Sequence, residues 1–220
     1  MTGIADSSLR ETLRRFDRWR TIATLLDQRP YDEPDFENSR LYFRSDYAAQ
    51  VAEWSAAREK GDWGAYIIEP CPSGLFSVIR SLWHERAPRR TETIETVFTQ
   101  LEDAGKYVIA RVANSIRFDA GVSSLSIRWS DRDFNSMIKI MPPSDKFLQC
   151  FIEKTPGMDA DNAHDYYLDQ YSLSGRPSTE AVTSSDNRPY MQVLGLSFEE
   201  LDAELLDGLP LATVPPLPVD

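Results

Sequence analysis

The chain has 220 residues, a net charge of −11 and a hydrophobic fraction of 41%, a composition that argues against intrinsic disorder and allows a substantial core. No apolar run approaches the roughly 18–20 residues needed to cross a bilayer, and residues 1–10 lack the basic and apolar regions of a secretory signal, so we expect a cytoplasmic protein. Acidity on this scale repels phosphate groups, which makes nucleic acids and anionic membranes poor partners.

Negative charge is concentrated in the last third of the chain. From Pro156 onwards there are 12 acidic residues against two arginines, a net charge of −10, whereas the preceding residues are almost neutral. An acidic surface favours association with a basic protein and accelerates the encounter through long-range attraction. Solubility alone is the alternative explanation. The charge pattern therefore indicates a basic protein partner.

The N-terminal region predicts an amphipathic helix over residues 8–28. Ser8 and Glu11 form a capping box, in which a hydroxyl and a carboxylate satisfy the first free amides of a helix. Apolar residues then follow at three- and four-residue steps: Leu9, Leu13, Phe16, Trp19, Ile22 and Leu26. The opposite face carries the arginines Arg10, Arg14, Arg15, Arg18 and Arg20. We expect this face to be solvated and paired with local acids such as Glu11 and Asp17, with an anionic ligand as the alternative.

The next segments predict strands with one helix between them. Aromatic and β-branched residues indicate four short strands, over residues 41–43, 63–68, 75–84 and 93–98. A helix over residues 46–60 separates the first two strands and ends at Gly61. Turn chemistry at residues 71–74 joins the second and third strands as a hairpin.

A further helix is predicted over residues 100–117. Thr99 and Glu102 form another capping box at its start. Its buried stripe is expected to run through Leu101, Ala104, Val108, then Arg111 or Val112, and then Ser115 or Ile116. Gly105 lies inside this helix, where glycine is less favourable than alanine by about 1 kcal/mol.

After Gly121 the apolar residues alternate with period two, which is typical of half-buried strands. We therefore predict a three-stranded meander, with strands over residues 122–129, 134–141 and 147–154. Two short turns project from the end of this meander and supply the candidate partner-binding residues Asp131, Asp133, Phe134, Pro143 and Asp145. Their acids would attract a basic partner and the aromatic ring would anchor it. Ordinary solvated turns are the alternative.

The remainder of the chain predicts less regular structure. A short helix capped by Asp161 is expected within residues 158–174, and residues 174–189 carry the weakest structural signal. Ser197 and Glu200 form a third capping box, which opens a short helix that ends at Gly208.

Strands in the middle of the chain and helices at both ends predict an α+β fold. The sheet is expected to be mainly antiparallel, with a central meander packed by helices from the N-terminal, middle and C-terminal regions. In this interpretation residues 1–210 form a single domain and residues 211–220 a proline-rich extended tail.

The sequence contains no recognisable motif for catalysis, cofactor binding or metal binding. It lacks the glycine-rich phosphate loops of nucleotide-binding proteins and the GxSxG elbow of hydrolases. The cysteines and histidines occur without metal-ligand spacing, at Cys71, Cys150, His84 and His164. We expect the cysteines to be two separate buried thiols, as is usual in a reducing compartment. We therefore expect that the protein is not an enzyme and uses no cofactor or metal.

Two stretches resemble a known bacterial family. Residues 98–117 combine an aromatic residue, a Glu-Asp-Ala triplet that begins at Glu102, Tyr107 followed by two apolar residues, and a final apolar residue followed by Arg117. Residues 196–201 read Leu-Ser-Phe-Glu-Glu-Leu. Both are similar to immunity proteins found in actinobacteria beside polymorphic toxins of the necrotizing-toxin type, which are NAD glycohydrolases. The two stretches cover about 26 residues of the chain.

This resemblance implies a small cytoplasmic antitoxin that docks on its cognate toxin domain and occludes the NAD pocket, without chemistry of its own. The chain departs from the family pattern in its longer acidic C-terminal third and in Gly105, where a charged residue is usual, so no inhibitory residue is transferred. We therefore expect a non-catalytic binding protein. The alternatives are an acidic secretion chaperone and a small hydrolase or transferase with an unrecognised site.

Overall fold

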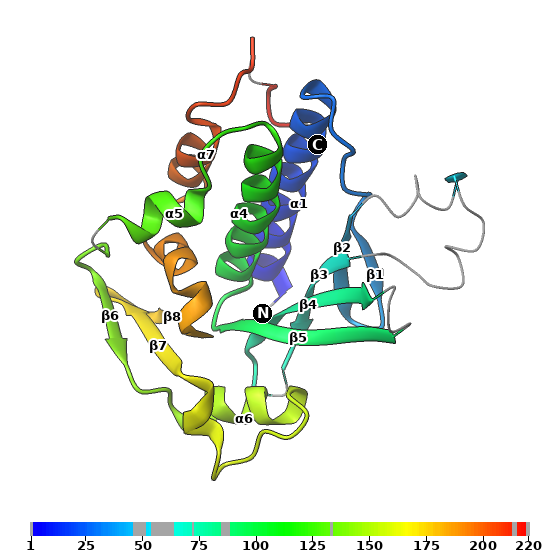
Figure 1. The fold of residues 1–220 in the computed structure, drawn as a ribbon. Coiled ribbons are helices and arrows are strands. Elements are labelled where there is room, and N and C mark those ends of the chain that lie inside the picture. Colours follow the sequence, from blue (N-terminus) through cyan, green and yellow to red (C-terminus); the bar gives the residue numbers. More distant parts are fainter. Residues whose placement is uncertain are drawn as a thin grey trace.

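The computed structural model describes residues 2–45, 52–53, 64–71, 73–84, 89–132, 134–212 and 215–218 (Figure 1). Its strands are β1 (Asp35–Glu37), β2 (Arg40–Arg44), β3 (Gly64–Pro70), β4 (Phe76–His84), β5 (Arg89–Phe98), β6 (Ile138–Met141), β7 (Leu168–Leu173) and β8 (Arg176–Ser184). Its helices are α1 (Thr2–Leu25), α4 (Leu101–Asp119), α5 (Leu125–Ser130), α6 (Asp145–Lys154) and α7 (Phe198–Leu206), with the 3-10 helices η1 (Ala163–Tyr166) and η2 (Ser185–Gly195). The helix predicted over residues 46–60 lies outside the described residues, apart from residues 52–53, which are helical.

The described strands form one antiparallel sheet in the order β1-β2-β3-β4-β5-β8-β7-β6. Strands β1 to β5 follow one another as a meander, and β6 to β8 form a second meander in reverse order. The two meanders join where β5 pairs with β8. The predicted α+β class with a mainly antiparallel sheet is confirmed, as are the strands predicted over residues 41–43, 63–68, 75–84 and 93–98.

Alternate residues of the sheet face two different hydrophobic cores, as the pleat of a strand requires. Phe98 and Ala181, which pair across β5 and β8, belong to the larger core, whereas the neighbouring pair Val97 and Val182 belongs to the smaller one. Residues of α1, α4, η2 and α7 complete the larger core, and the buried face of α6 completes the smaller one. Helices therefore cover both faces of the sheet at the β5–β8 junction.

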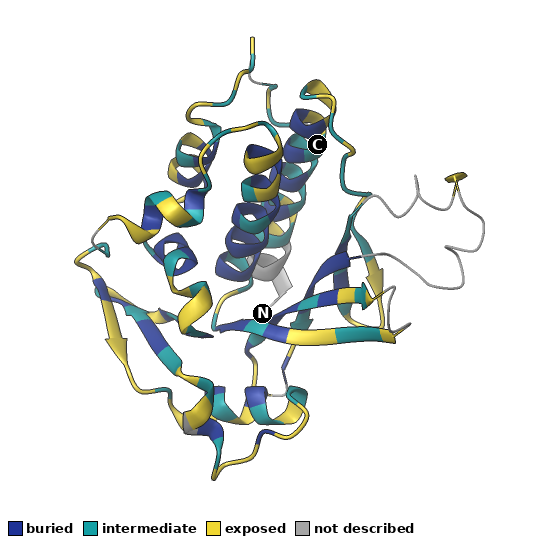
Figure 2. Cartoon of the chain, viewed as in Figure 1, coloured by how far each residue is buried: buried dark blue, intermediate teal, exposed yellow. Residues whose placement is uncertain are grey.

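Helix α4 lies at the centre of the larger core and is buried along most of its length (dark blue in Figure 2). The predicted stripe positions Ala104, Val108, Val112 and Ile116 are all buried. Gly105 is explained by the neighbouring helix α1, because a Cβ at this position would lie 2.2 Å from Oγ1 of Thr12. Glycine thus allows α1 and α4 to approach closely, which outweighs its low helix propensity.

The capping box predicted at the start of α4 is wrong. The residue that caps the helix is Gln100, and its side chain makes no capping hydrogen bond. The Thr99 hydroxyl lies 2.6 Å from the carbonyl oxygen of Ser178 and 3.2 Å from that of Glu180, on β8. Strand β8 supplies these acceptors through a long-range pairing that local sequence spacing could not show.

Helix α1 confirms that the N-terminal region is helical, but it runs from Thr2 to Leu25 instead of 8–28. Ser8 and Glu11 therefore lie inside it, and the capping box predicted there is wrong. The local ion pairs expected on its basic face are present, Arg14 with Glu11 and Arg20 with Asp17. The expectation of a solvated face is nevertheless wrong for Arg15, which is 3% exposed. Its guanidinium pairs with Asp202 of α7 at 2.5 Å, and Arg18 pairs with the same carboxylate at 2.7 Å. The basic face thus holds α7 against α1.

Two of the three strands of the predicted central meander are wrong. Residues 122–129 contain helix α5, residues 147–154 lie in helix α6, and only the end of the segment 134–141 forms a strand, β6. The buried residues of α6 are Phe147, Cys150 and Phe151, at the i, i+3, i+4 spacing of a helix. The alternation of apolar residues was misleading because both periods fit so short a segment.

The C-terminal third also differs from the prediction. The helix capped by Asp161 is wrong, because the segment 158–174 holds only the short η1 and then β7. Residues 174–189, expected to carry little structure, form β8 and the start of η2. Polar side chains of β8 are buried but satisfied across the sheet: the Thr183 and Thr96 hydroxyls lie 3.0 Å apart. Composition therefore underestimated this strand.

A disulfide joins Cys71 and Cys150, so the expectation of two separate thiols is wrong. Cys71 follows β3 and Cys150 lies on the buried face of α6, with a Cα–Cα distance of 6.4 Å. The two residues are 79 positions apart, and their proximity depends on α6 packing beneath the β3–β4 hairpin. Disulfides persist in oxidising compartments and are rare in the cytosol, so the pairing bears on where the protein works.

The C-terminal helix confirms its prediction. Ser197 caps α7 with both hydrogen bonds of the capping box to Glu200, and Gly208 follows with a φ of 80°. Residues 211–212 and 215–218 form neither helix nor strand, and the carbonyl oxygens of Pro215 and Pro218 accept hydrogen bonds from α1. Among the helices of the described residues, none combines the length and apolar composition needed to span a bilayer.

Candidate functional site

A largely apolar groove of about 620 Å³ lies at the end of the sheet, between β6 and the segments around α6 and η1. Most of its lining is aliphatic or proline, and Asp169 supplies a carboxylate. The lining residues are Ile140, Met141, Pro142, Pro143, Leu148, Ala160, Ala163, Tyr167, Leu168 and Asp169. A cavity of this size and polarity suits a segment of a polypeptide or a small apolar molecule.

Strand β6 forms one wall of the groove and is the last strand of the sheet. Its inner edge pairs with β7, and among the described residues no strand pairs with its outer edge. Ile140 and Met141 are 42% and 38% exposed on this strand. An edge strand with free backbone groups and exposed apolar side chains is a template for pairing with another chain.

Tyr167 also lines the groove and directly precedes β7. Its φ is 50°, in the left-handed region that bulky residues rarely adopt, and its side chain is 76% exposed. Such backbone conformations cluster at ligand-binding sites because the surrounding structure must maintain them. The aromatic ring is therefore held outwards beside the groove, where a partner can cover it.

A hydrogen-bond network fixes the turn between β6 and α6. The Ser144 amide donates to Oε1 of Gln170 at 2.8 Å, and Nε2 of Gln170 donates to Oε1 of Glu180 at 2.9 Å. Nζ of Lys146 donates to Oε2 of the same carboxylate at 2.9 Å. Gln170 is 4% exposed, so the network is anchored within the sheet. The groove is thus bordered by a rigid turn, which lowers the entropic cost of binding.

Acidic side chains surround the groove. Asp169 belongs to its lining, Asp159 and Asp161 flank the lining residue Ala160, and Asp145 begins α6. Two residues further along β7, burial and then the Asp169 carboxylate raise the pKa of Tyr171 to about 12, so this phenol stays neutral. The rim therefore presents negative charge beside apolar surface.

The structure separates the residues predicted to bind a partner. Pro143 lines the groove and Asp145 lies two residues further on, exposed at the start of α6. Asp131 is exposed at the end of α5. The buried residues of α5 belong to the larger core, so α5 and α6 lie on opposite faces of the sheet. Asp133 lies outside the described residues.

Phe134 is placed differently from the other predicted residues. Its half-buried ring stacks on Tyr171, with centroids 5.9 Å apart, and the guanidinium of Arg188 lies 5.2 Å from its centre. The ring therefore packs against the larger core rather than projecting from a turn.

Apart from Pro143, the residues that line the groove were not among those predicted to bind a partner. Ile140 and Met141 fall in a predicted half-buried strand and Tyr167 in a region predicted to hold a helix, where apolar side chains need no further explanation. One local signal was available: the two prolines that follow Met141 end the strand at once, and prolines are typical of sheet edges. In the described part of the chain, His, Cys, Asp and Glu side chains do not gather in groups of three or more that could hold a metal ion.

Comparisons with known proteins leave the family open. No protein-family model matches the chain, and no curated protein sequence matches it. Among solved structures, the chain is similar to Rv3902c from M. tuberculosis, with a TM-score of 0.48 and 13% sequence identity, over 86% of this chain and 87% of that chain. A likeness at this level carries no conclusion about function.

Proposed function

We propose that this protein works by binding another protein, and that it is an immunity factor which inhibits a cognate toxin domain such as an NAD glycohydrolase. The observation that carries the proposal is the apolar groove beside the open edge of β6. Exposed apolar surface of this kind marks interaction sites, since it has no stabilising role in the isolated chain. Edge strands bind partners by strand addition, in which backbone hydrogen bonds provide affinity and side-chain pockets provide specificity.

The surroundings of the groove define the partner segment. Its backbone would extend β6, and apolar side chains at alternate positions would enter the groove between Ile140 and Tyr167. A lysine or arginine of the partner would face Asp169, in agreement with the acidic C-terminal third of the chain. We therefore propose an extended, apolar and basic segment of the toxin as the occupant.

The toxin class rests on the resemblance of residues 98–117 and 196–201 to immunity proteins of necrotizing-type toxins. The first stretch forms the end of β5 and most of α4, and the second begins α7. Both contribute to the larger core, so the resemblance concerns residues that hold the fold. Contact residues at a surface vary more freely, which is compatible with a groove that the resemblance does not cover.

Replacing Ile140 with aspartate tests the proposal. The new carboxylate would be desolvated in the complex, and we expect the affinity for the toxin domain to fall at least about tenfold. The matched control is Ile127→Asp on α5, because Ile127 is also exposed, at 60%, but does not line the groove. Affinity is measured by titration calorimetry, and function by the concentration that suppresses NAD hydrolysis by the toxin.

The expected result is a weakened Ile140→Asp variant beside an Ile127→Asp variant that inhibits like the unmodified protein. Equal inhibition by both variants and the unmodified protein would show that the groove is not the interface. If the unmodified protein neither binds nor inhibits the toxin domain, the immunity function itself is contradicted.

A further inference from the structure

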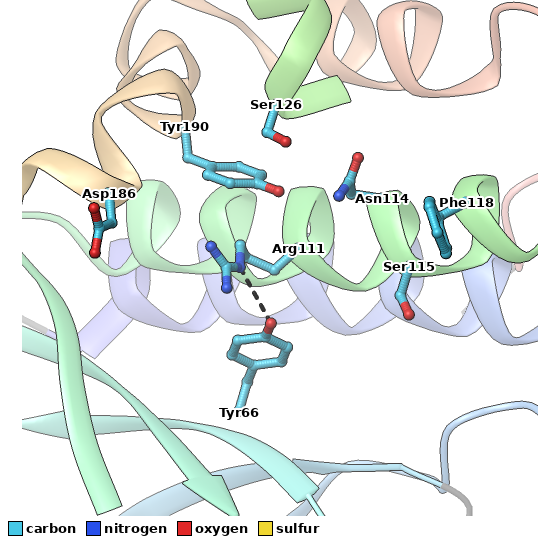
Figure 3. A pocket seen from close by; sticks show the side chains of 8 residues that line it. All are labelled: Tyr66, Arg111, Asn114, Ser115, Phe118, Ser126, Asp186 and Tyr190. Carbon is cyan, nitrogen blue, oxygen red and sulfur yellow. Dashed lines mark hydrogen bonds between the residues drawn. The ribbon is translucent and has the colours of Figure 1, made fainter. Parts of the chain in front are cut away.

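A second cavity, of about 380 Å³, lies on the face of the sheet that α4 covers and differs in chemistry from the groove (Figure 3). Its walls come from α4, α5, η2 and β3, and most of its lining side chains are polar. The lining residues are Tyr66, Arg111, Asn114, Ser115, Phe118, Ser126, Asp186 and Tyr190. Neither the groove nor the proposed toxin interface involves these residues.

Arg111 is the cation of this pocket and is held in place by three hydrogen bonds. Nε donates to the hydroxyl oxygen of Tyr66 at 3.1 Å, and the terminal nitrogens donate to Oδ1 of Asn187 at 2.9 Å and Oε1 of Glu95 at 3.2 Å. A guanidinium has five N–H donors, so two have no partner in these bonds. The side chain is 21% exposed, which places a fixed but reachable fork at the cavity.

Aromatic rings surround the same guanidinium. Its carbon lies 4.7 Å from the centre of the Tyr190 ring and 5.7 Å from that of Tyr66, and Figure 3 shows it between the two. Burial raises the pKa of Tyr190, so its hydroxyl remains a protonated donor at neutral pH. The rings orient the guanidinium, so little further ordering is needed when a ligand binds.

Asn114 adds donors at the cavity wall. Its Oδ1 already accepts two hydrogen bonds, from the Ser124 hydroxyl at 3.0 Å and from the Leu125 amide at 2.6 Å. The amide orientation is thereby settled, and Nδ2 is the group directed towards the hydroxyl of Tyr190 in Figure 3. Ser115 and Ser126 line the same cavity, but the Ser126 hydroxyl lies 2.7 Å from that of Ser124 and donates to it, because the Ser124 hydrogen is used on Asn114. Nδ2 of Asn114 is therefore the amide donor that the cavity offers.

Two carboxylates lie near the pocket, and only that of Asp186 belongs to its lining. Glu95 does not line it, and both of its oxygens are engaged, by Arg111 and by the Tyr107 hydroxyl at 2.8 Å. Asp186 does line it, is exposed, and stands at one end of the cavity in Figure 3, with the 70% exposed ring of Phe118 at the other. Asp186 thus weakens the attraction of the pocket for anions without blocking it.

We propose that this pocket binds a carboxylate, which the positive charge of Arg111 attracts and the Nδ2 amide of Asn114 receives, while an apolar body lies against Phe118. Hydrogen bonds to an ionised carboxylate are stronger than those to a neutral oxygen. The carboxylate belongs either to a free small molecule or to an acidic side chain of a bound protein. The site is independent of the toxin groove.

Sodium benzoate is the probe, and binding is followed by NMR shifts of the full chain, with benzamide as the uncharged control of the same shape. Asn114→Asp keeps an oxygen for the Ser124 and Leu125 donors but replaces the Nδ2 donors with negative charge, so benzoate affinity should fall at least about tenfold. Asp186→Asn removes the charge at the rim, so affinity should rise about twofold to fivefold. Unchanged thermal unfolding confirms that both variants fold.

A lower benzoate affinity of Asn114→Asp and a higher one of Asp186→Asn, with no binding of benzamide, support a carboxylate site. Changes of reversed sign, equal binding of benzamide, or no shift of the residues that line the pocket would overturn the proposal.

Adding the toxin domain then separates the two sources: displacement of benzoate, with weaker toxin binding by Asn114→Asp, assigns the carboxylate to the partner protein. Undisturbed benzoate binding in the toxin complex assigns it to a free small molecule. Ile140→Asp should leave benzoate affinity unchanged, so this result does not depend on the groove.

Discussion

Replacing Asp202 with alanine should lower the free energy of unfolding by about 3 kcal/mol, because it removes the shared partner of two arginines in the α1–α7 interface. Asp202 is 5% exposed and forms ion pairs with Arg15 at 2.5 Å and with Arg18 at 2.7 Å. Arg15 is itself 3% exposed and also pairs with Glu11 and Glu199, but without Asp202 its Nη1 would retain only the carbonyl oxygen of Phe198 as an acceptor. Urea unfolding followed by circular dichroism measures the change.

Glu199→Ala is the matched control for this prediction. Glu199 lies on the same helix and pairs with the same guanidinium at 2.5 Å, but its side chain is 75% exposed. Water screens such a pair, and its loss should cost less than about 1 kcal/mol. Equal losses of unfolding free energy in the two variants would contradict the prediction, since the buried and the exposed carboxylate would then contribute equally to stability.

Removal of the disulfide is the second change with a large expected effect. A crosslink between residues 79 positions apart restricts the unfolded chain strongly, and natural disulfides contribute about 2–4 kcal/mol. The double variant Cys71→Ala/Cys150→Ala should lose this amount relative to the oxidised protein. Urea unfolding with and without reductant measures it, and replacing both cysteines avoids a free thiol.

Reductant supplies the control within the same experiment. It should lower the stability of the unmodified protein to nearly that of the double variant and leave the double variant unchanged. A protein whose stability is indifferent to reductant would show that the crosslink does not stabilise the fold. Helix α6 carries both Cys150 and the groove residue Leu148, so loss of the disulfide should also loosen one wall of the groove.

The sequence predicted elements whose signals are local and missed those that depend on distant partners. The capping box at Ser197 is confirmed because both of its groups lie within one turn. The same motif at Thr99 is wrong because β8, far along the chain, supplies acceptors for the hydroxyl. Helix α6 was predicted as a strand, since the apolar residues of so short a segment fit both the helical and the strand period. Its crosslink to Cys71 shows how it is held in the fold.

The candidate site was predictable only in part, for a related reason. Pro143 and Asp145 were predicted as turn residues of a meander that the structure does not form. Pro143 nevertheless lines the groove, and Asp145 lies two residues further on, at the start of α6. Ile140 and Tyr167 could not be chosen, because an exposed apolar residue and a buried one are identical in sequence. Only the sheet order, with β6 at its end, shows that these side chains lack a covering element among the described residues.

Hydrogen–deuterium exchange on the complex with the toxin domain tests the central claim most directly. Strand addition gives new acceptors to the β6 amides that do not already donate to β7, apart from the Ile138 amide, which donates to the Asn135 carbonyl. Exchange of these outward amides should slow by at least about tenfold on binding. Amides of the edge strand β1, at the other end of the sheet, should be unchanged and serve as the internal control. A stable complex in which β6 exchanges as fast as in the free protein would contradict the proposed interface.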